Sequence, residues 1–126
     1  MKIYVAHSRG FDFEKELYEP IRKSYLNNKH TFIFPHENNN NSNSKDFLKN
    51  ECKLMIAEVS YSATNLGMDL SWANFFKVPI KGIYHKGVEV PVEFRYVSQT
   101  LLEYTNSKDL ISKIEKIIKE VEKYTI

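Results

Sequence analysis

Short apolar runs alternate with amphipathic stretches along this chain, and the two patterns predict different elements. Strands are predicted where apolar residues cluster, at Lys2–Ala6, Thr31–Phe34, Leu54–Val59, Val78–Tyr84 and Thr100–Tyr104. Helices are predicted where apolar residues recur at helical spacing, from Phe13 to Tyr25, from Ser44 or Lys45 to Asn50, over Gly67–Phe76, and along a last stripe from Leu110 to Val121. The almost wholly apolar run Leu54–Val59 is typical of a strand that helices cover on both faces.

Local signals refine these elements. Pro20 falls inside the first helical pattern and predicts either a kink or a second helical segment that begins there. Ser107 is the expected N-cap of the last helix. The segment Asn38–Ser44 reads NNNNSNS, and because asparagine and serine favour turns and bury little, it predicts a mobile surface loop.

The alternation of strands and helices predicts an α/β fold, with a single domain over residues 1–126. Five strands in a chain of this length suit a doubly wound, flavodoxin-like or Rossmann-like parallel sheet with helices on both faces. Such sheets bind ligands at the carboxyl ends of their strands, where the strand order reverses. The polar segments at these ends are His7–Gly10, Pro35–Glu37, Glu58–Thr64 and Tyr84–Lys86.

Composition and charge exclude several classes of function. The chain has 18 basic and 16 acidic residues in mixed order, which leaves no basic stripe for a nucleic-acid polymer. Cys52 is the sole cysteine and the histidines show no paired spacing, so we expect no disulfide and no metal. Neither a membrane-spanning run nor a signal peptide is evident, and no glycine-rich nucleotide motif occurs. The expectation is a cytoplasmic protein without a cofactor.

Two segments near the predicted strand ends carry groups that could bind or react. Asp69 follows Gly67 in the expected first turn of a helix, where a carboxylate either stabilises the helix N-terminus or stays ionised as a nucleophile. Ser8, Arg9 and Gly10 form a loop that either holds phosphate or sugar oxygens or is simply solvated. The residues alone leave both pairs of alternatives open.

Three further polar residues have a structural explanation that their positions favour. Tyr4 alternates with Ile3 and Val5 and so points to the opposite face of the sheet, where a core contact is expected. Asp46 lies in the first turn of the short helix, as helix-start carboxylates commonly do. Glu58 lies in the buried third strand, where an unpaired charge is costly, so a bonded partner is expected.

Three segments resemble the nucleoside 2-deoxyribosyltransferase-like family, which includes the 2'-deoxynucleoside 5'-phosphate N-hydrolases. They read IYVAHSRGFDFEKELYEPI, KLMIAEVS and LGMDLSWANFFKVPI, and the resemblance extends over nearly the whole chain. Its most specific part is the family block A-E-V-S … G-[MIY]-E-L-G-x-A, here AEVS…GMDLSWA. The resemblance implies cleavage or transfer at the N-glycosidic bond of a nucleoside or nucleotide, through a carboxylate nucleophile and a glycosyl-enzyme intermediate.

The resemblance also implies roles for individual residues. The nucleophile of the family falls on Asp69, the tyrosine that orients it on Tyr4, and the aspartate near the leaving base on Asp46. The implied substrate-binding residues are His7, Ser8, Arg9 and Gly10 after the first strand, and Ser60, Thr64 and Gly67 after the third. Members of the family are usually homodimers or larger, and Gly87–Val97 is expected near such a contact.

Two departures from the family pattern keep an alternative function open. Asp69 replaces the usual glutamate and is one methylene shorter, and Ala63 replaces a serine or aspartate that contacts substrate. A displacement of ~1 Å at a reacting group can cost ~100-fold in rate. The alternative is a catalytically impaired homologue that acts as a nucleoside- or nucleotide-binding module. Cleavage of another nucleotide–sugar bond, such as one to nicotinamide, is a third possibility.

Overall fold

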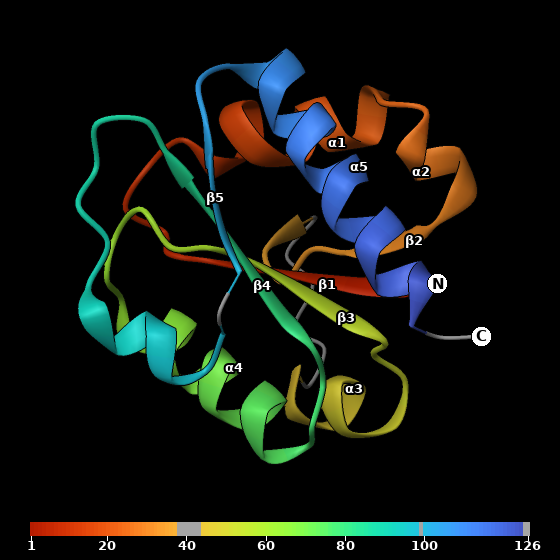
Figure 1. The fold of residues 1–126 in the computed structure, drawn as a ribbon, viewed down its shortest axis with the longest axis vertical. Coiled ribbons are helices and arrows are strands. Elements are labelled where there is room, and N and C mark those ends of the chain that lie inside the picture. Colours follow the sequence, from red (N-terminus) through yellow and green to blue (C-terminus); the bar gives the residue numbers. More distant parts are fainter. Residues whose placement is uncertain (38–43, 99, 125–126) are drawn as a thin grey trace.

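Five parallel strands form one sheet in the computed structural model, which describes residues 1–37, 44–98 and 100–124 (Figure 1). The strands are β1 (Lys2–His7), β2 (Thr31–Ile33), β3 (Leu54–Glu58), β4 (Ile80–His85) and β5 (Leu101–Tyr104). Their order is β2-β1-β3-β4-β5, so the order reverses between β1 and β3. This topology confirms the predicted doubly wound α/β fold.

Helices cover both faces of the sheet, as predicted (Figure 1). On one face lie the π-helix η1 (Glu14–Tyr18), α1 (Glu19–Lys23), α2 (Leu26–Lys29) and α5 (Ser107–Lys123). On the other face lie α3 (Ser44–Asn50), α4 (Thr64–Phe75) and the 3₁₀-helix η3 (Val92–Tyr96). None of the helices in the described ranges is long and apolar enough to span a membrane.

The alternation of side chains along β1 builds two hydrophobic cores. Ile3 and Val5 pack toward α1 and α5, whereas Tyr4 and Ala6 pack toward α3 and α4. Every residue of β3 is buried, as expected for a strand that is covered on both sides. Tyr4 is therefore a buried residue on the α4 face, and its place on that face determines which groups it meets.

Several predicted boundaries differ from the structure. The helix expected at Gly67 begins earlier, at Thr64, and its N-cap Ala63 provides no side-chain hydrogen bond. The N-cap of α5 is Asn106 rather than Ser107, because the Asn106 side chain accepts the backbone N–H of Asp109 at 2.9 Å. Of the loop expected at 38–44, residues 38–43 lie outside the described residues, and Ser44 opens α3.

The first helical segment is divided as Pro20 predicted. Its opening turns form a π-helix, and the backbone N–H of Glu19 bonds to the carbonyl of Glu14, five residues earlier. Pro20 then lies in the first turn of α1, where its missing N–H leaves no hydrogen bond unmade. A second helical segment, α1, therefore begins next to this proline, at Glu19.

Candidate active site

Buried polar side chains gather at the carboxyl ends of β1 and β3, where the strand order reverses. They include His7, Ser8, Glu58 and Ser60, each at most 5% exposed. The strand register pairs His7 with Glu58, so these two side chains lie side by side at the edge of the sheet. Because His7 and Tyr4 point to opposite faces of β1, the polar groups form separate networks on the two faces.

The network on the α4 face contains Asp69. This residue is 7% exposed and lies in the second turn of α4, where its Oδ2 accepts a hydrogen bond from the Tyr4 hydroxyl at 2.9 Å. The same hydroxyl lies 2.9 Å from Oγ of Ser44 at the start of α3. The structure thus brings together the two residues expected to be nucleophile and orienting tyrosine, and it adds Ser44, which sequence reasoning missed.

Burial is the main influence on the pKa of the Asp69 carboxyl. Loss of solvent raises the pKa of Asp69 to about 6, although the hydrogen bond from Tyr4 opposes the shift. Because α4 begins at Thr64, Asp69 lies beyond the first turn and the helix dipole is not what sets its charge. The prediction of a first-turn carboxylate held ionised by the helix dipole was therefore wrong, although the carboxyl still ionises near neutral pH.

The network on the opposite face contains His7, whose ring is fully buried. Its Nδ1 lies 2.6 Å from the carbonyl oxygen of Ser8, which can only accept, so Nδ1 carries the proton. Nε2 then accepts from the hydroxyl of Tyr18, which in turn accepts the backbone N–H of His36. Burial lowers the pKa of His7 to about 4, so the ring is neutral at pH 7. Both ring nitrogens are engaged within the protein, and His7 is not brought to Asp69.

The loop after β1 is partly buried and partly exposed. Ser8 is buried, and its Oγ accepts the backbone N–H of Gly10 at 3.3 Å. Arg9 and Gly10 are exposed. Burial lowers the pKa of His36, and the charge of Arg9 lowers it further. The Nε2 atom of His36 is buried without a hydrogen-bond partner among the described residues. Of this loop, Arg9 and Gly10 are placed to meet a ligand from solvent.

Glu58 has the bonded partners that its buried position predicted. Its Oε1 accepts the backbone N–H of Ser60 at 2.7 Å, and its Oε2 accepts the hydroxyls of Ser60 and Tyr104. The Ser60 hydroxyl also accepts the backbone N–H of His85 at 2.8 Å. Burial raises the pKa of Glu58. Ser60, expected to bind substrate, thus ties the end of β3 to β4.

The other expected site residues lie at the N-terminal ends of α3 and α4. Asp46 is exposed in the first turn of α3, two residues after Ser44. Thr64 and Gly67 are exposed on α4. Between them, the side chain of Asn65 donates to the carbonyl oxygen of His7 at 3.1 Å. This bond ties the first turn of α4 to the end of β1.

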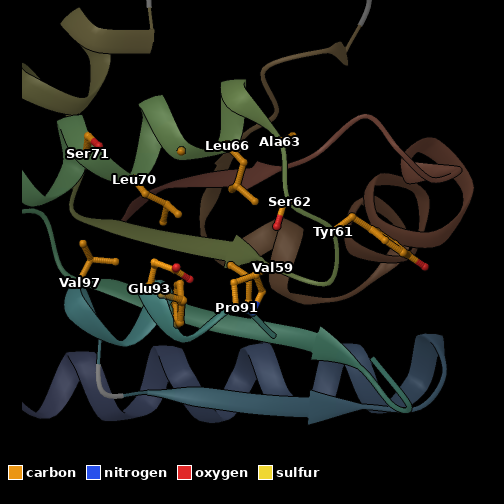
Figure 2. A pocket seen from close by; sticks show the side chains of 12 residues that line it. Val59, Tyr61, Ser62, Ala63, Leu66, Leu70, Ser71, Pro91, Glu93 and Val97 are labelled. Carbon is orange, nitrogen blue, oxygen red and sulfur yellow. The ribbon is translucent and has the colours of Figure 1, made fainter. Parts of the chain in front are cut away.

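A cavity of about 600 Å³ lies on the other flank of α4, between this helix and η3 (Figure 2). Leu66 and Leu70 of α4 point into it toward Val59, and Glu93 lies on the opposite wall. Asp69 does not line the cavity, because its carboxyl is directed to the hydroxyl of Tyr4 instead. Among its described lining residues Glu93 alone is charged, so the cavity suits an uncharged or amino-bearing group better than a phosphate.

Close packing at β4 holds η3 in its place beside this cavity. A Cβ on Gly82 would lie 2.4 Å from Cζ of Phe94, so the Phe94 ring packs directly on the bare backbone of β4.

No group of three or more metal-ligating side chains occurs among the residues that the structure describes. The Asp69 site itself presents a carboxylate and the hydroxyls of Tyr4 and Ser44.

These elements define a doubly wound α/β protein whose reversal point carries a buried aspartate–tyrosine pair. No protein-family model matches the chain, and no curated protein matches its sequence. Among solved structures, the CMP N-glycosidase BcmB of Clostridium botulinum is similar, with a TM-score of 0.66 and 16% sequence identity. The match covers 91% of this chain and 99% of that one. At this identity the likeness establishes a common fold.

Proposed function

We propose that this protein cleaves the N-glycosidic bond of a nucleoside or nucleotide, with Asp69 as the nucleophile. The observation that carries the proposal is the hydrogen bond of 2.9 Å from the Tyr4 hydroxyl to the buried carboxyl of Asp69, beside the point where the strand order reverses. The sequence resemblance to nucleoside 2-deoxyribosyltransferase-like proteins and the fold shared with a CMP N-glycosidase both support it.

The chemistry follows from the hydrogen bond. Tyr4 binds Oδ2 of Asp69, so we assign the attack on the anomeric carbon to Oδ1. The C–N bond breaks as the C–O bond forms, and the departing base takes the electron pair and a proton, for which the exposed Asp46 is our candidate donor. Water then attacks the glycosyl ester, and the sugar leaves with its configuration retained. A second base in place of water would give transfer instead.

The exposed part of the site fits a sugar or a phosphate. Arg9 and the backbone of Gly10 offer a guanidinium and an N–H at the end of β1. We assign any 5'-phosphate to this loop, because the cavity beside α4 has an acidic wall. Thr64, at the start of α4, is the remaining candidate for a sugar hydroxyl.

A binding module without turnover is the second candidate function. The observation that favours it is the 7% exposure of Asp69, whose side chain is also one methylene shorter than the glutamate of the family it resembles. A carboxylate that is both short and buried reaches less far toward a sugar. In this case the loop after β1 and the start of α4 would bind a nucleotide and leave it intact.

We further propose that the protein is a cytoplasmic homodimer. The apolar side chains Met68 and Phe75 of α4, and Val92 and Tyr96 of η3, are 49–80% exposed on the same face of the sheet. Large exposed apolar side chains that lie on one face of a protein commonly mark contacts with another protein. A second copy of the chain is the partner that the family resemblance implies.

Release of free base is the test of the enzymatic proposal. The protein is incubated at high concentration with the common nucleosides and their 5'-monophosphates, CMP included, and the products are separated by chromatography. We expect base release by the wild type and none by Asp69→Asn. If no substrate releases base, but one of them raises the melting temperature of both the wild type and Asp69→Ala, the binding module is the better description.

A further inference from the structure

We propose that Ser44 is a positioning residue for Asp69 and acts on it through the hydroxyl of Tyr4. The proposal rests on the function proposed above, because it concerns how the same carboxylate is held. Ser44 Oγ lies 2.9 Å from Tyr4 Oη, which lies 2.9 Å from Asp69 Oδ2. The three residues come from α3, β1 and α4, so the chain of hydrogen bonds joins three elements.

The number of hydroxyl protons determines which group donates in each of these hydrogen bonds. A tyrosine hydroxyl has one proton, and Tyr4 donates it to Asp69. The contact between Ser44 and Tyr4 must then use the proton of the serine, so Ser44 donates and Tyr4 accepts. Ser44 thereby fixes the rotation of the Tyr4 hydroxyl toward the carboxylate.

Tyr4 and Asp69 are buried, so the hydrogen bonds between them and Ser44 cannot easily be replaced by bonds to solvent. Tyr4 is 1% exposed and Asp69 7%, so bulk water cannot readily replace a missing donor. Burial and the Tyr4 hydrogen bond are the influences on the pKa of Asp69. The other titratable side chains on the elements that pack against α4 are Lys2 and His7 of β1, Lys45, Asp46 and Lys49 of α3, and Lys81, Tyr84 and His85 of β4.

The two hydrogen bonds stabilise the ionised form of the Asp69 carboxyl, which is the reactive form. A hydroxyl that accepts a hydrogen bond becomes a better donor, and a donor gains more from a charged acceptor than from a neutral one. Donation by Ser44 therefore favours ionised Asp69, which is the form that attacks. Loss of the serine hydroxyl should raise the pKa of Asp69 by roughly a few tenths of a unit.

Ser44 is also the first residue of α3, so a purely structural role has to be separated from this one. Ser44→Ala removes the donor, whereas Ser44→Thr keeps a hydroxyl at the same place. Lys49→Ala is the matched control, because Lys49 is an exposed side chain of the same helix. Tyr4→Phe removes the hydroxyl through which Ser44 acts, and this makes a double-mutant cycle possible.

Two measurements test the proposal. In the base-release assay we expect Ser44→Ala to lower kcat about 10-fold with little change in KM and to shift the acidic limb of the pH profile upward. Ser44→Thr should restore both, Lys49→Ala should change neither, and Ser44→Ala should have no further effect in the Tyr4→Phe background. An equal effect of Ser44→Ala with and without the Tyr4 hydroxyl would overturn the proposal.

The second measurement needs no turnover. An NMR titration of the Asp69 carboxyl carbon should give a higher pKa in Ser44→Ala than in the wild type, and the wild-type value in Ser44→Thr and Lys49→Ala. An unchanged titration in Ser44→Ala rejects the positioning role even if the protein is active. A shifted titration in a protein that releases no base supports the positioning role and contradicts the enzymatic function instead.

Discussion

The side-chain amide of Asn65 donates to the carbonyl oxygen of His7 at 3.1 Å, and this bond joins the first turn of α4 to the carboxyl end of β1. Asp69 lies one turn further along the same helix, and its partner Tyr4 lies on the same strand as His7. The Asn65–His7 bond and the Tyr4–Asp69 bond therefore connect α4 to β1 at two positions, one helical turn apart on α4. The first holds the helix where the second can form.

Replacing Asn65 should loosen this connection. Asn65→Ala removes a partly buried hydrogen bond, and we expect the free energy of unfolding to fall by about 1 kcal/mol. Base release should fall as well, because Asp69 is less well placed. Urea denaturation measures the first effect and the chromatographic assay the second.

Asn74→Ala is the matched control for this prediction. Asn74 is an exposed residue of the same helix, and its replacement by alanine changes helix propensity in the same direction. The difference between the two variants isolates the hydrogen bond to His7. Equal unfolding free energies for the two would show that this bond does not hold α4.

Asp69→Asn should make the protein more stable at neutral pH. Burial raises the pKa of Asp69 from 3.8 to about 6, so the folded state binds the proton more tightly than the unfolded state. The stability of the wild type should therefore fall as pH rises from about 4 to 6 and stay lower above that, with a cost of about 3 kcal/mol at most. Asparagine carries no charge and can still accept from Tyr4.

The measurement is urea denaturation of Asp69→Asn and the wild type at pH 4 and at pH 7.5. We expect a difference in unfolding free energy of roughly 1–3 kcal/mol at pH 7.5 and a small one at pH 4. Glu58 and His7 also have shifted pKa values, but their contributions cancel in the comparison. If Asp69→Asn raised the free energy of unfolding equally at both pH values, ionisation of Asp69 would not be what destabilises the folded wild type.

The positions of the strands could be predicted because their apolar runs are local and strong, and the alternation of strands with helices predicted that the sheet is parallel. The start of α4 could not, since Ala63 provides no capping hydrogen bond and Gly67 resembles a helix boundary more than an interior residue. The pairing of Tyr4 with Asp69 came from the family resemblance. Ser44 and Tyr18 gave no signal, because their partners lie on other elements and a single sequence contains no information on such contacts.

Gly67 should tolerate a side chain, in contrast to Gly82. A Cβ at Gly67 would meet no atom within 4 Å, and alanine in a helix interior is more favourable than glycine by ~1 kcal/mol. A Cβ at Gly82 would lie 2.4 Å from Cζ of Phe94. We therefore expect Gly67→Ala to raise the melting temperature and Gly82→Ala to lower it. A loss of stability in Gly67→Ala would mean that α4 is packed more tightly there than the structure shows.

The exposed apolar face of α4 and η3 should be the contact of a homodimer. Phe75 and Tyr96 are 78% and 80% exposed, and a charge at either position would be buried without a partner in such an interface. Light scattering after size-exclusion chromatography should give a dimer for the wild type and a monomer for Phe75→Asp with Tyr96→Asp. Tyr124→Asp is the control, because Tyr124 is 88% exposed at the end of α5, on the other face of the sheet, and should leave the dimer intact. A wild type that stays monomeric at high concentration would contradict the proposed dimer.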